Sequence, residues 1–515
     1  MTSNAAAAAR ATPRSTTTDV LIVGSGFSGL GMAINLRRSG REDFIVIDKA
    51  DEVGGTWREN TYPGCACDIP SHMYSFSYAL NPDWTNSYSA QPEIWNYLRR
   101  VADDFDLRPK LHFGIEMTSA RWDDSDQVWR VSTAQGATYT ARVLVSGIGG
   151  LHLPNIPVLP GQEQFRGVAF HSARWRHDVD LAGKRVAVLG TGASAIQFVP
   201  EIAKQAEHVT VYQRTARWVL PKADGPIPER TRALFRRVRG TQRAYRAARY
   251  WLLETRALMF NGHPRMVRVA ESMVRRHIER SVNHPDLRRR LVPDYRLGCK
   301  RVMLSNDYYP TLNRDNVDLV NGAVERITPT GVIGADGVER EVDVIVYGTG
   351  FHVNDSFEYL DVVGRGGNEL REQFRREGIE TYLNVNVARF PNFCFVLGPN
   401  SALGHNSVVF MSEQQAAYVI RLLDEMDARS VRVVEVRPQA QARYTDHVQA
   451  KLEKGVWSTG GCSSWYLDSR GSNRSIWPGF SFTYWWRTRK VDADAYVWGL
   501  PESSEVRAKQ APMTA

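Results

Sequence analysis

The chain has 515 residues, of which 43% are hydrophobic, and it carries a formal net charge of +9 with an isoelectric point near 9.3. This length predicts two or three domains rather than one core. The sequence lacks any run of about 18 apolar residues, so it predicts no membrane-spanning helix. The basic charge alone allows a nucleic acid, a membrane surface or a phosphate-bearing ligand as partner. Because the sequence contains no nucleic-acid-binding motif, we expect no nucleic-acid partner.

The N-terminal segment and the cysteines indicate the cellular compartment in which we expect the protein. Residues 1–17 are rich in Ala, Ser, Thr and Arg and lack the apolar core of a secretory signal, so we expect a disordered tail. The five cysteines are odd in number and sparse, at positions 65, 67, 299, 394 and 462. Such a set argues against a disulfide framework and favours a reducing cytoplasm.

A nucleotide-binding pattern begins at Asp19. The apolar run to Val23 predicts a buried parallel strand, which leads into a glycine turn from Gly24 to Gly29 and then a helix. Glycines at these positions let the backbone turn tightly and approach a pyrophosphate at the helix N-terminus. A second strand ends at Asp48, 24 residues after Gly24, where a carboxylate accepts hydrogen bonds from a ribose 2′-hydroxyl. The pattern predicts a ligand without a 2′-phosphate, either FAD or NAD.

A loop rich in turn-forming residues follows, from Gly54 to Asp68. Its two cysteines, Cys65 and Cys67, are separated by one residue and have no second cluster, so packed thiols are expected rather than a redox pair or metal ligands. Taken alone, Asp68 fits a turn cap as well as a catalytic group.

A second nucleotide unit follows a proline-rich linker at residues 153–160. The strand from Arg185 to Leu189 leads into another glycine turn, and the matching second strand ends at Arg214 and Thr215. Arg214 lies 24 residues after Gly190, the same offset that placed Asp48. A cation and a hydroxyl at this position suit a 2′-phosphate, which predicts NADP(H); the alternative is an exposed arginine at a strand end.

Two further segments leave alternatives open. Residues 226–294 are helical in pattern and rich in arginine, which fits either a solvated helical insertion or a surface that touches anionic lipid. The stretch from Val408 to Met426 predicts a long helix, and the segment from Trp457 to Trp486 is crowded with aromatic residues. Those aromatic residues fit an apolar substrate pocket and core packing equally well.

Two motifs give the sequence a family resemblance. Phe165, Gly167, His171 and Trp175 match the pattern FxGxxxHxxxWP, although Arg176 stands at the final position. Gly54, Trp57, Tyr62, Pro63, Gly64 and Asp68 match the pattern GGxWxxxxYPGxxxD. With both glycine turns, the chain resembles a class B flavoprotein monooxygenase, and within that class a Baeyer-Villiger monooxygenase, from about Thr18 to the aromatic C-terminal segment.

The resemblance implies an α/β fold with two dinucleotide-binding, Rossmann-like domains and a helical insertion. It implies an FAD domain in two parts, residues 18–152 and 393–515, the second carrying a segment that lines the substrate. The NADP domain would comprise residues 153–225 and 295–392, and residues 226–294 would be the insertion.

The resemblance also implies an activity and a set of site residues. NADPH would reduce FAD, oxygen would form a C4a-peroxyflavin, and its attack on a ketone would give an ester or lactone, with no metal. The catalytic residues would be Arg301 and Asp68. The expected FAD contacts are Gly24, Gly26, Phe27, Ser28, Gly29, Asp48, Lys49, Gly55, Thr56, Trp57, Asp68 and Tyr74. The expected NADP contacts are His171, Gly190, Thr191, Gly192, Ala193, Ser194, Arg214, Thr215, Lys300 and Arg301.

Three other functions are compatible with paired nucleotide folds. An N- or S-oxygenating flavin monooxygenase would act on a soft nucleophile, whereas Asp68, Arg301 and Trp175 favour the ketone enzyme. An NADPH-dependent disulfide reductase needs two cysteines at CxxC or CxxxxC spacing, which Cys65 and Cys67 do not supply. A non-catalytic flavin-binding redox sensor would lack a catalytic group, and the sequence retains each one that the resemblance implies.

Overall fold

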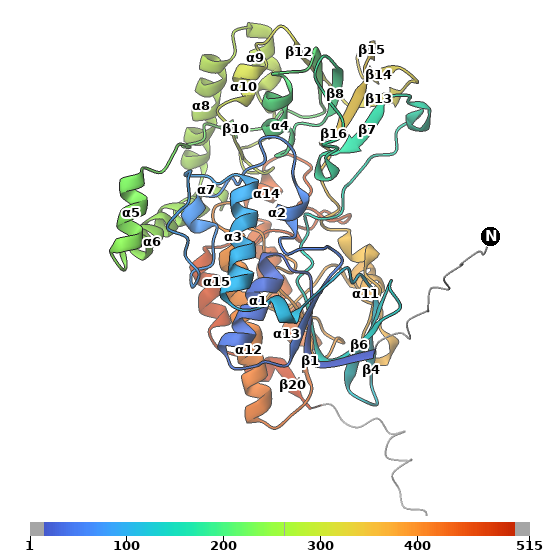
Figure 1. Ribbon diagram of the computed structural model, residues 1–515, viewed down its shortest axis with the longest axis vertical. Coiled ribbons are helices and arrows are strands. Elements are labelled where there is room, and N and C mark those ends of the chain that lie inside the picture. The colour runs from blue at the N-terminus through green and yellow to red at the C-terminus, as the bar shows by residue number, and fades with distance from the viewer. Residues whose placement is uncertain (1–14, 262, 500–515) are drawn as a thin grey trace, which may run out of the picture.

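The computed structural model describes residues 15–261 and 263–499. It contains two parallel-rich sheets at opposite ends of an elongated molecule, with helices between them and along one side (Figure 1). The expected α/β architecture, with two Rossmann-like units and a helical insertion, is confirmed.

In the first sheet β1 pairs in parallel with β2 on one side and with β6 on the other. Its strands, in spatial order, are β17 (Val362–Val363), β4 (Met117–Asp123), β5 (Val128–Thr133), β6 (Thr138–Ser146), β1 (Ser15–Val23), β2 (Phe44–Asp48) and β3 (Leu111–Phe113), with β18 (Phe393–Phe395) also on β6. Because β1 begins at Ser15 and pairs there with Thr138, the expectation of a disordered tail is wrong for residues 15–17. Residues 1–14 of that expected tail lie outside the described residues.

The second sheet is parallel throughout. Its order is β12 (Val317–Asn321), β9 (His208–Gln213), β8 (Arg185–Leu189), β16 (Val344–Tyr347) and β7 (Val168–His171). Its central strands are apolar runs because helices and loops cover both faces of a parallel sheet. An antiparallel ribbon precedes β16, formed by β13 (Val324–Ile327), β14 (Gly331–Gly334) and β15 (Glu339–Glu341).

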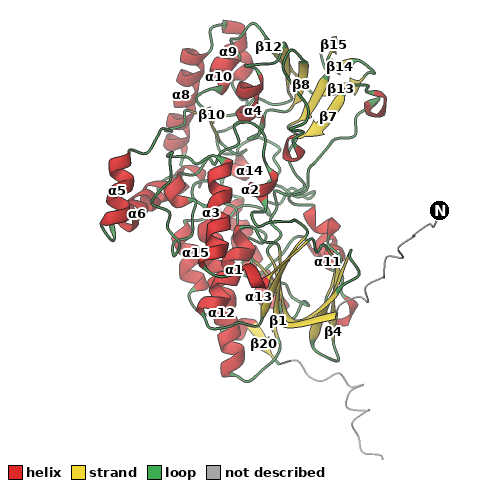
Figure 2. Ribbon diagram, in the orientation of Figure 1, coloured by secondary structure: helices red, strands yellow, loops and turns green. Residues whose placement is uncertain are grey.

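Helices connect and cover the two sheets (Figure 2). The long helix expected from Val408 is confirmed as α12 (Val408–Ala428), which packs against α1 (Phe27–Arg38). The remaining helices outside the insertion are α2 (Thr56–Glu59), α3 (Gln91–Asp104), α4 (Ala195–Ile202), α10 (Tyr308–Thr311), α11 (Leu370–Glu377), α13 (Pro438–Leu452), α14 (Val456–Thr459) and α15 (Ser481–Thr488). No helix in the described ranges is long and apolar enough to cross a bilayer.

A short strand pair closes the base of the helical insertion. The insertion helices are α5 (Glu229–Arg237), α6 (Thr241–Glu254), α7 (Ala257–Phe260), α8 (Pro264–Ser281) and α9 (Pro285–Leu291). On either side of them, β10 (Val219–Leu220) pairs in parallel with β11 (Met303–Leu304). This pairing brings the chain back beside its point of departure and so fixes the position of the segment that carries Lys300 and Arg301.

After β16 the chain returns to the first sheet. Strand β17 pairs with β4, and β18 pairs with β6. This return precedes residue 393, the boundary suggested from the sequence, because β17 and α11 already pack on the first sheet. In the C-terminal segment Trp477 and Tyr484 are buried against each other, so for these two rings core packing is correct.

The cysteines differ in part from expectation. Cys65 and Cys67 are buried free thiols, as predicted. Cys299 and Cys462, however, form a disulfide with a Cα–Cα distance of 6.1 Å. The expectation that the cysteine set forms no disulfide is therefore wrong at this pair. The partners are 163 residues apart, and only the tertiary fold brings them together.

Candidate functional site

The first glycine turn is built around close backbone contacts. Gly24 has a φ of +100°, and a Cβ there would lie 2.7 Å from the carbonyl oxygen of Gly147. A Cβ on Gly29 would lie 1.7 Å from the oxygen of Gly24, so no side chain fits. Asp48 fixes the turn, because its Oδ2 accepts hydrogen bonds from the backbone nitrogen and the hydroxyl of Ser25, at 2.7 and 2.6 Å.

Asp48 and Lys49 are adjacent in the sequence, but their side chains lie in different surroundings. The Oδ1 of Asp48 accepts a hydrogen bond from the backbone nitrogen of Ala50 at 2.9 Å. A carboxylate has about four acceptor positions, so capacity remains for a ribose hydroxyl. Lys49 points elsewhere, since its Nζ lies 3.7 Å from Glu116 at the surface. The structure does not bring Lys49 to the glycine turn.

Aromatic rings and a second glycine pair face the turn. Gly26, buried Ser28 and the start of α1 lie against the loop before α2; a Cβ on Gly26 would lie 3.6 Å from the Cα of Gly55. Trp57, next to Thr56 at the start of α2, donates to the hydroxyl of Tyr74 at 3.1 Å. Phe27 meets Tyr74 edge to face, with ring centroids 5.1 Å apart. These expected FAD contacts therefore lie together, and they fit an extended planar ligand next to a pyrophosphate cradle.

The expected catalytic pair is in direct contact. The Nη2 of Arg301 lies 2.6 Å from the Oδ2 of Asp68, and its Nε donates to the same oxygen at 3.2 Å. Both side chains are partly exposed, at 36% and 25%. The carboxylate of Asp68 raises the pKa of Arg301 further above its ordinary value, so the guanidinium stays charged.

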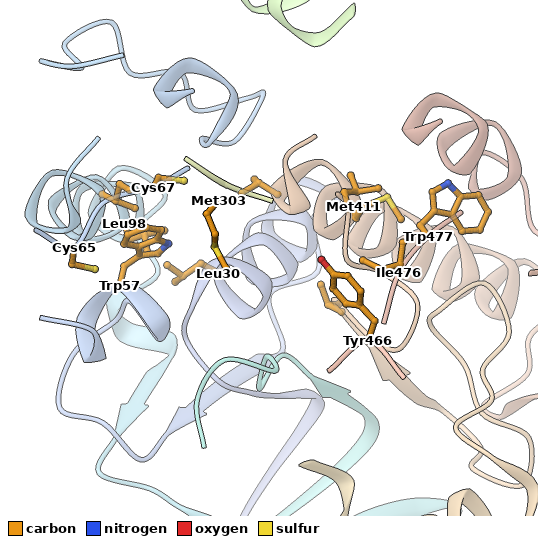
Figure 3. Packing of buried hydrophobic residues seen from close by; sticks show 14 of the residues in the cluster. Leu30, Trp57, Cys65, Cys67, Leu98, Met303, Met411, Tyr466, Ile476 and Trp477 are labelled. Carbon is orange, nitrogen blue, oxygen red and sulfur yellow. The ribbon is translucent and has the colours of Figure 1, made fainter. Parts of the chain in front are cut away.

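Arg301 lies between the two nucleotide units and the C-terminal segment. Figure 3 shows Cys65, Cys67, Met303 and Tyr466 within one buried cluster. Tyr466 is buried, and burial raises its pKa to about 12 although Arg301 acts in the opposite direction. The Cys299–Cys462 disulfide covalently joins the segment that carries Arg301 to the segment that carries Tyr466.

The second glycine turn repeats the construction of the first. Gly190 has a φ of +108°, and a Cβ there would lie 2.6 Å from the oxygen of Gly348. The hydroxyl of Thr191 donates to the carbonyl of Thr215 at 3.4 Å. Gly192, Ala193 and Ser194 complete the turn immediately before α4. The turn and the end of β9 are therefore adjacent, as the sequence predicted.

Three cations gather next to this turn. Lys300 is 91% buried, and its Nζ lies 5.1 Å from the ring centre of Tyr295. Burial first, and then the charges of Arg217 and Arg214, together lower the pKa of Lys300 to about 8. Cations whose charges act on one another in this way fit a dianionic phosphate. The sequence analysis missed Arg217; its position three residues after Arg214 was the signal available.

His171 ends β7 at the joint between the two units. Its Nδ1 accepts a hydrogen bond from the backbone nitrogen of Ala173 at 3.1 Å. Burial lowers its pKa to about 4, so the imidazole is neutral at pH 7. Trp175 packs on Phe170 and Phe198. Arg176, where the motif departs from its pattern, forms an exposed ion pair with Asp178 and touches neither glycine turn.

Gln197 on α4 links the two units, and the sequence analysis missed it. Its Oε1 accepts from the hydroxyl of Tyr62 at 2.9 Å, and its Nε2 donates to the carbonyl of Ala66 at 2.9 Å. The loop that ends at Asp68 is thereby fixed to the helix that follows the second glycine turn. An amide on a helix carries no distinguishing pattern in one sequence, so no signal pointed to it.

The comparisons with known proteins agree with this geometry. Residues 17–366 match the family model described as flavin-binding monooxygenase-like. A protein of Pseudomonas aeruginosa named Baeyer-Villiger monooxygenase is 46% identical over 478 residues, which is 93% of this chain and 90% of that protein.

Solved structures share the fold over most of the chain. A steroid monooxygenase bound to NADP is 32% identical with a TM-score of 0.82, and covers 94% of this chain and 100% of its own. The enzyme OTEMO in complex with FAD and NADP is 26% identical with a TM-score of 0.84 and the same coverage. This chain belongs to the flavin-binding monooxygenase-like family and, within it, to the Baeyer-Villiger monooxygenases.

Proposed function

We propose that this protein is an FAD-containing, NADPH-dependent Baeyer-Villiger monooxygenase that inserts one oxygen atom from O2 beside the carbonyl carbon of a ketone. The ion pair between Arg301 and Asp68 is the observation that carries the proposal. It places a permanently charged guanidinium between the two nucleotide units, next to aromatic residues that suit a flavin. The named relative and the cofactor-bound neighbours support the same reaction class.

The two glycine turns bind the two cofactors in this proposal. Asp48 holds the first turn and accepts from the ribose of FAD, which once reduced by NADPH supplies the oxygen chemistry. Lys300, Arg214 and Arg217 bind the 2′-phosphate of NADPH, because their mutual repulsion is relieved by a dianion. Burial keeps His171 neutral at the joint, where it positions the nicotinamide half without adding charge.

Arg301 has the central chemical role. Negative charge develops on oxygen when the ketone carbonyl is attacked, and a fixed guanidinium stabilises that charge. Asp68 keeps the guanidinium in one orientation through two hydrogen bonds. Removal of a single stabilising donor of this kind typically lowers turnover by about 10²–10³-fold.

A substrate screen tests the proposal. Purified protein with FAD, NADPH and O2 is incubated with a panel of linear, cyclic and aromatic ketones, alongside a sulfide and an amine. We expect ester or lactone one oxygen atom heavier than the ketone. If O2 is reduced only to hydrogen peroxide in the presence of every ketone, while the sulfide or amine is oxygenated, the protein is instead an N- or S-oxygenating enzyme and the proposal fails.

A further inference from the structure

Helix α6 turns two polar side chains, one near each end, toward the protein. Gln242 is buried and donates to the carbonyl of Asn81 at 2.6 Å. Glu254 is buried as well and accepts from the amide of Asn406 at 2.7 Å. A helix on the surface of a globular protein normally buries its apolar residues, whereas α6 buries these two polar side chains together with Leu253, which is 1% exposed.

The opposite side of α6 is apolar and faces solvent. Ala244, Ala247, Ala248, Trp251 and Leu252 are all exposed and recur at spacings of three and four residues, which places them on one stripe. Trp251 and Leu252 are 57% and 54% exposed. An apolar stripe of this kind is unfavourable in water, which indicates that something covers it.

Helix α15 extends this surface. The ring of Trp251 lies 5.7 Å from that of Phe482, and the hydroxyls of Tyr250 and Ser481 are 2.8 Å apart. Trp485 and Trp486 on α15 are 42% and 62% exposed. The helices α6 and α15 lie on the same side of the molecule in Figure 1. We name the α6–α15 face as the exposed residues Ala244, Ala247, Ala248, Trp251, Leu252, Trp485 and Trp486.

Positive charge borders the α6–α15 face. Residues 229–260 contain nine arginines and two glutamates, and one of those glutamates is the buried Glu254. Arg489 lies 3.8 Å above the ring centre of Trp486. Among the described residues, exposed Arg243, Arg256 and Lys490 take part in no ion pair. The border of the face therefore carries cations that no carboxylate neutralises.

The exposed apolar residues and the cations at their border together favour one of two kinds of partner. A second copy of the chain would bring the same cations against each other, and like charges at an interface cost free energy. An anionic lipid surface instead offers headgroups to the arginines and an interfacial layer in which tryptophan rings are favoured. We propose that the α6–α15 face docks the enzyme on an anionic lipid bilayer, with the tryptophans inserted at headgroup depth and no helix spanning the membrane.

Vesicle binding by the full-length, FAD-loaded protein tests this docking. The protein is sedimented with phosphatidylcholine vesicles and with vesicles that also contain phosphatidylglycerol. We expect at least about tenfold stronger partition onto the anionic vesicles, falling steeply as salt screens the arginines. No binding, or equal binding to both vesicle types, would overturn the proposal.

Substitutions on the α6–α15 face test whether vesicle binding depends on it. Trp251→Ser with Trp486→Ser should lower the partition about tenfold, and Arg243→Gln with Arg256→Gln should remove the preference for anionic lipid. Val158→Ser is the matched control, because Val158 is 97% exposed and lies outside the face. FAD content and circular dichroism verify folding, and the single Trp486→Ser variant replaces the double one if the latter does not fold.

Light scattering tests the alternative that a second copy of the chain covers the α6–α15 face. If the parent protein is a dimer that Trp251→Ser with Trp486→Ser makes monomeric, the face is an interface between copies and the lipid proposal is wrong. Unchanged vesicle binding by the same variant would likewise remove the face from membrane docking. None of these readouts depends on turnover, so they stand apart from the ketone assay.

Discussion

The guanidinium of Arg301 and the carboxylate of Asp68 are 233 residues apart in the chain and 2.6 Å apart in the structure. Arg301 follows the helical insertion at the base of the β10–β11 pair, whereas Asp68 ends the loop that Gln197 attaches to α4. The ion pair therefore joins the segment after the insertion to the loop that is itself attached to α4. Its geometry depends on how the two nucleotide units are placed relative to each other.

Replacing Arg301 by alanine should separate reduction from oxygenation. The variant should lose ketone oxygenation by about 10²–10³-fold, because no fixed cation remains near the developing charge. Flavin reduction by NADPH should change much less, since hydride transfer does not need that cation. Stopped-flow absorbance measures reduction under anaerobic conditions, and gas chromatography measures the ester.

Asp68→Asn provides the companion variant. It keeps a similar shape but removes the carboxylate charge that orients Arg301, so we expect a smaller loss of ester formation and more hydrogen peroxide per NADPH consumed. An Arg301→Ala enzyme that forms ester at the parent rate would remove this residue from the mechanism.

Binding of NADPH should weaken above about pH 8, where the buried amine of Lys300 loses its proton. Its pKa is lowered from the ordinary 10.5 to about 8, so the free enzyme carries the charge below that pH and loses it as the pH rises. A bound phosphate favours the protonated form, which means that binding near pH 9 must take up a proton. Fluorescence titration from about pH 7 to about pH 9.5 should show the Kd for NADPH rising, and steady-state kinetics over the same range should show its KM rising.

Two controls isolate this effect. NADH lacks the 2′-phosphate, so its weaker binding should show no such pH dependence. Lys300→Arg should flatten the NADPH profile because a guanidinium stays protonated throughout this range. A Lys300→Arg enzyme with the parent profile would assign the pH dependence to another group.

Gln197→Leu should loosen the contact between the two units. The substitution leaves the hydroxyl of Tyr62 and the carbonyl of Ala66 without their partner, which costs about 1–3 kcal/mol of unfolding free energy. We also expect more hydrogen peroxide per NADPH, because the loop that carries Asp68 is less well fixed. Thermal unfolding and peroxide assays measure both effects. Gln205→Leu, on an exposed side chain just after α4, should change neither.

The Cys299–Cys462 disulfide should stabilise the folded chain. Cys299→Ser should lower the unfolding free energy by about 3 kcal/mol, since the bridge closes a long loop in the unfolded state. Urea titrations with and without a reducing agent measure the loss. The reductant should destabilise the parent and leave the variant unchanged; equal sensitivity would contradict the role of the bridge.

The same disulfide bears on where the protein resides. A cytoplasmic location remains a prediction from the cysteine count, and cytoplasmic proteins rarely keep disulfides. Intact-mass measurement after rapid alkylation of cells would show whether Cys299 and Cys462 take up alkyl groups, as free thiols do, or remain joined in the disulfide. A fully reduced chain fits the predicted location, and a fully oxidised one contradicts it.

The glycine turns were predictable because their constraint is local. A Cβ on Gly29 would overlap the backbone within its own turn, so the sequence itself carries the requirement. Asp48 and Arg214 were found by their offset from Gly24 and Gly190, since a strand, turn and helix of standard length fix that distance. The family resemblance pointed to Arg301 and Asp68. Lys49 was placed at the site by proximity in sequence, yet its side chain faces Glu116.

By itself the sequence determined the two nucleotide-binding units, the helical insertion and the family. The units and the insertion rest on local patterns of strand, turn and helix, and the family rests on short motifs. The tertiary structure alone decided which distant groups meet: Gln197 with Tyr62, Arg217 with Lys300, and Cys299 with Cys462. It also decided that α6 points its alanines and Trp251 outward. Such contacts depend on the relative placement of whole domains, which no local pattern in a single sequence records.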